Sequence, residues 1–286
     1  RTSNSRMALI NLISKFVINC EELFTLKNSS DIRIIDCRWY LNKTNRGRLE
    51  YKNSHIENAI YFDIEKLSDN SVDLPHMFPS SEQIQNFVTT NGININHEII
   101  IYDQVGFFCS GRIWFILKVF GFKKIRILNG GFSEWTKNNL PVTNKIKKAE
   151  KSNFSCNSFE SKRIVNKKEL EKIIVENDCN TKVIDARPQN RFLGIEKEPR
   201  PNLKKGRIKN SINIPFDVIT KNMLIKNFDE LKHLIFNQKK IKKKNIIVCY
   251  CGSGVTACNI IFVLTLLGIK EVKLYDGSWA EWGKIK

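Results

Sequence analysis

The sequence lacks a long apolar run, and this excludes one class of protein. Its longest predominantly apolar stretch is Ile260–Leu267, far short of the roughly 20 residues that a membrane-spanning helix needs. It also lacks a CxxC pair, and its four histidines fall in no spacing typical of a zinc site. We therefore expect no membrane segment and no bound metal.

Acidic residues are scarce relative to basic ones. The 286 residues include 47 Lys and Arg against 29 Asp and Glu, which gives a formal net charge of +18. Such a balance can indicate an anionic partner such as RNA. However, no basic stretch is interleaved with aromatic residues, and Lys, Asn and Ile are enriched along the whole chain. We interpret the charge as compositional drift and expect no nucleic-acid partner.

The eight cysteines show no disulfide framework. They follow no regular spacing, and several lie within apolar runs, a pattern that favours reduced thiols and a cytoplasmic protein. The basic segment Arg1–Arg6 precedes Met7. It leaves two alternatives open, an upstream start or the remnant of a targeting extension, and with the latter a mitochondrial location.

The chain repeats itself with an offset of about 150 residues. Three pairs of segments resemble each other: Ile34–Arg38 and Val183–Arg187, His55–Ile60 and Arg207–Ile212, and Val119–Trp135 and Leu266–Trp282. A repeat of this length exceeds any solenoid unit. The sequence therefore predicts a duplicated domain.

Each half alternates short β-branched runs with longer helical stretches. This pattern is typical of an α/β fold with a central parallel sheet and helices on both faces. We predict strands at 33–36, 59–62, 98–102 and 124–128, and again at 182–185, 212–214, 245–250 and 271–274. The stretch 144–166 is rich in Lys, Ser and Asn and lacks an apolar period. We therefore predict an N-terminal domain (1–143), a linker (144–166) and a C-terminal domain (167–286).

Cys251 lies in the sharpest local signal of the sequence. We expect a buried strand to end at Tyr250, a glycine-bearing loop to follow, and a helix to run from near Thr256 to Gly268. Open α/β sheets bind ligands at this edge, where backbone N–H groups and a helix N-terminus can cradle an anion. Such surroundings favour a thiolate nucleophile. A buried structural cysteine before an ordinary turn is the alternative.

The loop Cys251–Ala257 resembles the active-site loop of the 3-mercaptopyruvate sulfurtransferases, in the two-domain rhodanese superfamily. The resemblance covers nearly the whole chain, including the Gly-x-x-x-x-Trp ending of each half and the segment Pro75–Pro79. It implies sulfur transfer through a persulfide on Cys251, with no metal or organic cofactor. Thiosulfate sulfurtransferases are similar but usually carry basic residues just after the cysteine, where this chain has Gly252 and Ser253.

The same resemblance implies that the N-terminal half is catalytically inert. Asp103 follows the strand 98–102, at the position that Cys251 occupies in the second half. Cys109 lies further along a loop that is one residue longer. We interpret Cys109 as a structural thiol.

The resemblance also implies which residues bind the substrate. Arg191 and Arg200 match two family arginines that hold the substrate carboxylate and carbonyl, and a guanidinium fork suits a planar carboxylate. Pairing of either arginine with Glu196 or Glu198 on the same loop is the alternative. The remaining predicted binding residues belong to the cysteine loop: Gly252, Gly254, Val255 and Thr256.

A proton relay completes what the resemblance implies. The family's serine–histidine–carboxylate arrangement maps onto Ser253, His76 and Glu65. The family usually has Asp at the position of Glu65, and Asp63 is close enough in sequence to compete with it. Imidazole exchanges protons near neutral pH, which suits a relay.

The resemblance thus implies an enzyme that moves sulfur from 3-mercaptopyruvate to an acceptor and releases pyruvate. The acceptor would be cyanide or a thiol, such as thioredoxin or a small thiol. The alternatives are a thiosulfate sulfurtransferase and a sulfur-relay protein that serves RNA or cofactor thiolation. Cysteine phosphatases also cradle an anion with a cysteine loop, but they require Arg six residues after the cysteine, and residue 257 is Ala.

Overall fold

The computed structural model describes residues 7 and 10–285, so the alternatives for Arg1–Arg6 lie outside the described residues. The chain forms two compact units, described separately below. The first comprises the chain up to Ser68, Pro79–Phe159 and Thr220–Ile225, and the second comprises Asp69–Phe78, Glu160–Ile219 and the chain from Lys226 onward. Each unit therefore includes one short segment from the other half of the sequence.

The first unit contains a five-stranded parallel sheet with the order β1-β6-β5-β2-β4. Its strands are β1 (Val17–Ile18), β2 (Ile32–Asp36), β4 (Ala59–Tyr61), β5 (Glu98–Tyr102) and β6 (Ile125–Leu128). Its helices are α2 (Cys20–Leu26), α3 (Arg46–Asn53), α4 (Ser81–Thr90), α5 (Ser110–Val119) and α6 (Gly131–Lys137). Two antiparallel pairs join β3 (His55–Ile56) to β7 (Val142–Thr143), and β11 (Thr220–Lys221) to β12 (Leu224–Ile225).

The second unit repeats this sheet, with the order β10-β9-β13-β14-β8 and all neighbours parallel. Its strands are β8 (Ile164–Val165), β9 (Thr181–Asp185), β10 (Ile212–Asn213), β13 (Ile246–Tyr250) and β14 (Val272–Tyr275). Its helical segments are η1 (Ser161–Arg163), α7 (Lys167–Glu176), α8 (Gln189–Phe192), η2 (Phe216–Ile219), α9 (Phe228–Lys232), η3 (His233–Gln238), α10 (Ala257–Leu266) and α11 (Ser278–Trp282).

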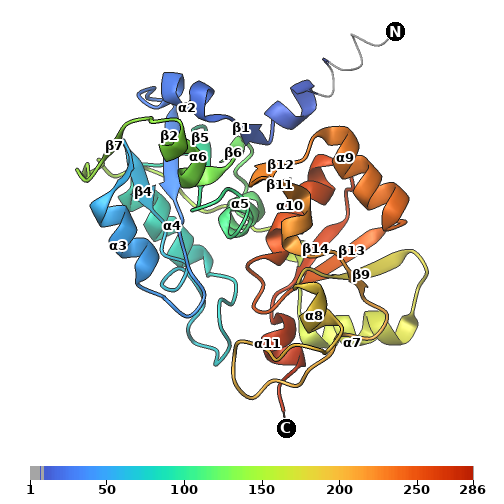
Figure 1. The fold of residues 1–286 in the computed structure, drawn as a ribbon. Helices are drawn as coiled ribbons and strands as arrows, with labels where there is room; N and C mark the ends of the chain where they lie inside the picture. The colour runs from blue at the N-terminus through green and yellow to red at the C-terminus, as the bar shows by residue number, and fades with distance from the viewer. Residues whose placement is uncertain (1–6, 8–9, 286) are drawn as a thin grey trace. The chain divides into compact units, whose positions relative to one another are not determined.

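Helices cover both faces of the second sheet (Figure 1). On one face α10 packs against β13 and β14, and η2 packs against α10. On the other, Leu170 of α7 and Trp279 of α11 join Val248 and Tyr250 of β13 in one apolar cluster. Because α10 is enclosed, nearly all its side chains are buried, which explains why the helix is apolar all round. The predicted α/β fold with tandem domains is therefore confirmed.

The predicted strands agree with the structure to within one residue at each end. The edge strands β1 and β8 were not predicted, because two residues are too few to establish a hydrophobic period. β8 lies inside the stretch 144–166 that the sequence assigns to the linker, where it pairs with β14. None of the helices in the described part of the chain is long and apolar enough to cross a membrane.

Candidate active site

Cys251 directly follows β13, the central strand of the second sheet, at the carboxyl end of the parallel strands. Its side chain is buried, and the Gly254 N–H donates a hydrogen bond to Cys251 Sγ over 3.1 Å. Gly254 has a φ of +83°, in the left-handed region that glycine adopts without a steric penalty. The turn at Gly254 thus directs a backbone donor at the sulfur, where it stabilises negative charge.

The rest of the loop leads into α10. Val255 is buried, and Thr256 is the N-cap residue of the helix, although its side chain makes no capping bond. Cys258, in the first turn of α10, donates its thiol to the Gly254 carbonyl over 3.3 Å. The structure therefore contains the predicted strand, loop and helix, with Cys251 where the strand meets the loop.

The segment that follows β14 fixes the backbone of this loop, a role that the sequence analysis missed. The Trp279 N–H donates to the Cys251 carbonyl and the Ala280 N–H to the Gly252 carbonyl, both over 2.9 Å. The Cys251 N–H in turn donates to Ser278 Oγ over 3.2 Å. The repeated Gly-x-x-x-x-Trp ending was the available signal, because the Phe132 N–H of the first unit makes the same bond to the Asp103 carbonyl.

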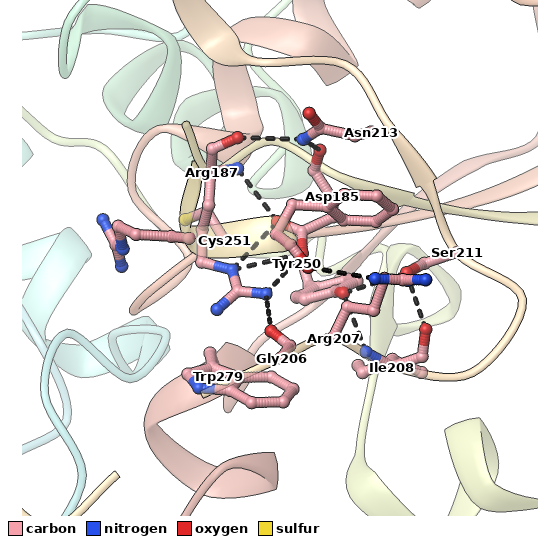
Figure 2. Close-up of polar contacts among 12 residues, drawn as sticks. Asp185, Arg187, Gly206, Arg207, Ile208, Ser211, Asn213, Tyr250, Cys251 and Trp279 are labelled. Atoms are coloured by element: carbon pink, nitrogen blue, oxygen red, sulfur yellow. Dashed lines mark hydrogen bonds and ion pairs between the residues drawn. The ribbon is translucent and has the colours of Figure 1, made fainter. Parts of the chain in front are cut away.

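A buried ion pair lies near the loop, as Figure 2 shows. The Arg187 guanidinium donates to both carboxylate oxygens of Asp185, at the end of β9, and to the Gly206 carbonyl over 2.7 Å. Its central carbon lies 4.4 Å from the ring centroid of Trp279. Arg38 pairs with Asp36 in the same way in the first unit. This arrangement supports the fold of each half and is not specific to the cysteine loop.

The two predicted binding arginines both approach Gly252. A Cβ placed on Gly252 would lie 3.0 Å from Arg191 Nη2 and 3.3 Å from Arg200 Nη1. Arg200 also donates to Ser253 Oγ over 3.2 Å, and Arg191 pairs with Glu198. The alternative raised from the sequence, an ion pair within this loop, is thus present for Arg191. It coexists with a position beside the cysteine loop.

Ser253 and His76 are hydrogen-bonded, although they are far apart in sequence. His76 Nδ1 lies 2.8 Å from Ser253 Oγ, and both residues are buried. Both belong to the second unit, because the segment Asp69–Phe78 is part of it. The Phe78 N–H donates to the carboxylate of Asp276 over 2.8 Å, which anchors the segment next to the Gly277–Ser278 turn.

The carboxylates proposed to assist His76 lie in the first unit. Glu65 Oε1 accepts a hydrogen bond from Trp39 Nε1 over 2.7 Å. Asp63 accepts bonds from the Glu65 and Lys66 N–H groups and pairs with Arg48. His76 belongs to the second unit, whereas Glu65 and Asp63 belong to the first. Support of His76 by either carboxylate therefore stays a prediction.

Two other buried thiols, those of Cys249 and Cys109, are less acidic than an ordinary cysteine. All eight cysteines are free thiols. Burial, together with the neighbouring Cys258 and Cys251, raises the pKa of Cys249 well above the ordinary value. Burial and the contact with Cys37 raise the pKa of Cys109 in the same way, and its thiol donates to the Cys37 carbonyl over 3.1 Å. Both groups therefore stay protonated at neutral pH, which agrees with a structural role for Cys109.

An open cavity of about 500 Å³ borders the site within the second unit. Arg200 is shared between this cavity and Ser253. The wall also includes Ala280, whose N–H contacts the loop at Gly252, and Pro75, next to His76. The cavity thus offers room for a small molecule beside the cysteine loop.

Comparisons with known proteins agree with this geometry. The rhodanese-like domain family matches residues 19–138 and 166–285. The chain is 34% identical over 266 residues to a mouse 3-mercaptopyruvate sulfurtransferase and 33% identical over 266 residues to a rat thiosulfate sulfurtransferase, in each case covering 92% of this chain and 88% of the relative. The crystal structure of SseA from Escherichia coli, which is described as having the rhodanese fold, superimposes with a TM-score of 0.82 at 32% identity, over 93% of this chain and 99% of that one. The chain therefore belongs to the rhodanese family and contains two copies of its domain.

Proposed function

We propose that this protein transfers sulfur from 3-mercaptopyruvate to a thiol or cyanide acceptor through a persulfide on Cys251. One observation carries the proposal: Cys251 Sγ accepts the Gly254 N–H beside a loop that two arginine side chains approach from one side. A sulfur nucleophile, a donor for its negative charge and cations for a carboxylate are thus collected within one loop. Relatives named for this activity support the choice of donor.

The first step forms one bond and breaks another. The Cys251 thiolate attacks the sulfur of 3-mercaptopyruvate, and the carbon–sulfur bond breaks with its electron pair left on carbon. The products are a Cys251 persulfide, which keeps the proton of the donor thiol, and the enolate of pyruvate. The Gly254 N–H stabilises negative charge on the cysteine sulfur, while Arg191 and Arg200 hold the carboxylate and carbonyl.

Ser253 and His76 would supply the proton that converts the enolate to pyruvate. The proton lost from the Cys251 thiol passes to His76 and returns through Ser253, so that no net proton is consumed. The 2.8 Å contact between His76 Nδ1 and Ser253 Oγ supports this route.

The second step returns the enzyme to its thiolate. Cyanide attacks the outer sulfur to give thiocyanate. Alternatively, one thiol takes that sulfur, and a second thiol releases it as hydrogen sulfide and leaves a disulfide. We propose thioredoxin or a small thiol as the physiological acceptor. A cytoplasmic location, with mitochondria as the alternative, stays a prediction.

Turnover with each donor tests the proposal. Purified protein should release pyruvate from 3-mercaptopyruvate in the presence of cyanide or dithiothreitol, and Cys251→Ser should release none. Cys109→Ser is the matched control, because it alters a buried thiol of the first unit and should leave turnover unchanged. Mass spectrometry after donor treatment without acceptor should locate 32 Da of added sulfur on Cys251.

Two outcomes would contradict the proposal in different ways. An enzyme that uses thiosulfate more efficiently than 3-mercaptopyruvate would be a thiosulfate sulfurtransferase, the activity for which the rat relative is named. Retained turnover in the Cys251→Ser variant, or added sulfur on Cys109, would place the chemistry elsewhere.

A further inference from the structure

Glu198 lies between two arginines of the second unit. It accepts from Arg187 Nη1 over 2.7 Å, and both of its oxygens accept from Arg191 Nε over 3.1 and 3.2 Å. Its side chain is only 2% exposed, and that of Arg191 is 13% exposed. The second oxygen of Glu198 also accepts from Arg191 Nη2, the nitrogen that approaches Gly252.

This bridge places the negative charge of Glu198 next to the guanidinium of Arg191, one of the two cations of the proposed donor site. A buried carboxylate is weakly screened by solvent, so its charge acts on any anion that Arg191 contacts. Arg187 holds the carboxylate from the other side and is itself neutralised by Asp185. Glu198 therefore lowers by one unit the positive charge that the Arg191 side contributes to the site.

We propose that Glu198 is a specificity-determining residue that favours monoanionic over dianionic sulfur donors. The inference rests on the proposed function and deepens it. 3-Mercaptopyruvate carries one negative charge, on its carboxylate, whereas thiosulfate carries two. The electrostatic attraction between the site and a donor scales with the product of their charges. Lowering the positive charge of the site by one unit therefore weakens binding of the dianion more than binding of the monoanion.

The first unit contains a similar bridge that lacks the proposed role. Glu50 pairs with Arg46 over 2.8 Å and lies 3.9 Å from Arg38, but its side chain is 30% exposed. The Arg46 guanidinium lies 4.0 Å from the centroid of the Tyr40 ring. An Arg–Glu–Arg bridge is thus a shared feature of the fold, whereas a buried glutamate behind an arginine at the cysteine loop is specific to the second unit.

The test is Glu198→Gln, with both donors measured on wild type and variant. Gln has nearly the same shape and keeps one acceptor oxygen but removes the charge. The ratio of kcat/KM for thiosulfate to kcat/KM for 3-mercaptopyruvate should rise about tenfold, the size expected for one partly buried charge. The decrease of kcat/KM for thiosulfate with ionic strength should also become steeper, because a dianion then meets a more positive site.

Glu50→Gln is the matched control, because it removes the equivalent carboxylate of the other bridge. It should leave the donor ratio unchanged. Glu196→Gln removes a charge from an exposed position on the same loop as Glu198 and should change the ratio less than twofold, because solvent screens it.

Binding without turnover gives a second readout. Sulfate, a dianion, and pyruvate, a monoanion, should each slow alkylation of Cys251 by iodoacetamide. Glu198→Gln should strengthen protection by sulfate more than protection by pyruvate. An equal fall in kcat/KM for both donors, with an unchanged ratio and salt dependence, would show that Glu198 only maintains the loop and would overturn the inference.

Failure of the proposed function would look different. In that case wild-type protein would turn over neither donor, and no persulfide would form on Cys251. A wild type that is active on 3-mercaptopyruvate together with an unchanged ratio in Glu198→Gln would reject this inference alone.

Discussion

The two units use the same strand–loop–helix element for opposite purposes. In the first unit the carboxylate of Asp103 accepts hydrogen bonds from five backbone N–H groups of its own loop, those of Val105, Gly106, Phe108, Cys109 and Ser110, over 2.5 to 2.9 Å. In the second unit Cys251 occupies the position of Asp103, and its sulfur accepts the Gly254 N–H. One loop encloses a carboxylate of its own, and the other has the proposed nucleophile at the same place.

This difference shows what the loop is built to do. Asp103 is fully buried, and its five bonds show that the loop backbone can surround a negative group with N–H donors. The proposed Cys251 thiolate carries its negative charge at the same position of its loop, where its sulfur accepts the Gly254 N–H. The first unit therefore illustrates, with a carboxylate, how the second can stabilise negative charge on the cysteine sulfur.

The largest expected effect comes from giving the Cys251 loop the residue found at the same position of the Asp103 loop. Cys251→Asp should abolish turnover with both donors, because it removes the only proposed nucleophile. Its carboxylate should accept hydrogen bonds from the loop N–H groups as that of Asp103 does, so the fold should remain. Activity assays and thermal unfolding check both halves of this expectation. A variant that unfolds, while Cys251→Ser remains folded, would show that the second loop cannot enclose a carboxylate.

The next effect, on stability, tests the first loop. Asp103→Ala leaves five backbone N–H groups, three of them in buried bonds, without their acceptor and should lower the free energy of unfolding by about 3 kcal/mol or more. Asp103→Asn keeps one oxygen acceptor and should cost less than Asp103→Ala. Urea unfolding of both variants, followed by fluorescence, provides the measurement. A loss below about 1 kcal/mol for Asp103→Ala would show that water replaces the carboxylate and that the loop does not depend on an anion.

The third effect concerns a contact for which the Asp103 loop has no counterpart. Val105 stands where the active loop has Ser253, the partner of His76. His76→Ala should lower kcat for 3-mercaptopyruvate about a hundredfold, since general acid–base groups typically contribute 10²–10⁴. Thiosulfate produces no enolate to protonate, so its kcat should fall much less. Equal losses with both donors in stopped-assay measurements would assign His76 to folding rather than proton transfer.

Much of this comparison was accessible from the sequence. The repeat, the strand positions and the exchange of Cys251 for Asp103 follow from local patterns, because buried strands are continuous apolar runs and duplicated motifs align. The choice of Arg191 and Arg200 as binding residues rested on a resemblance to known proteins, and their approach to Gly252 was not predicted. No local pattern fixes how the segment that carries these two arginines folds back toward the loop after β13.

Other features depend on contacts that sequence patterns do not encode. The hydrogen bond between His76 and Ser253 joins positions 177 residues apart. Glu198 was considered only as a surface partner for an arginine, but it is buried between two of them. The sequence places Asp103 correctly at the end of its strand. It does not predict the five N–H donors of its carboxylate, because the orientation of backbone N–H groups in a loop does not follow from residue type.

The smallest expected effect separates two contributions of one residue. Ser278 has a φ of +51°, and its counterpart Gly131 has a φ of +60°, so a side chain occupies a left-handed position where the first unit has glycine. Its hydroxyl accepts the Cys251 N–H and donates to the Tyr275 carbonyl over 3.0 Å. Ser278→Ala removes these bonds but keeps the strain, whereas Ser278→Gly removes both.

Both variants should lose a few-fold in kcat/KM, because the Cys251 backbone loses its acceptor. Ser278→Gly should be more stable than Ser278→Ala by about 1 kcal/mol, the cost of a left-handed residue that is not glycine. Asn177→Gly is the control, since Asn177 also lies in this region at the end of α7 and should gain stability without a change in activity. If both Ser278 variants lose activity equally and only Ser278→Gly gains stability, two conclusions follow. The hydroxyl positions the cysteine loop, and the left-handed backbone at residue 278 costs stability. Unchanged activity in both would show instead that the bonds from Trp279 and Ala280 are sufficient to hold the loop.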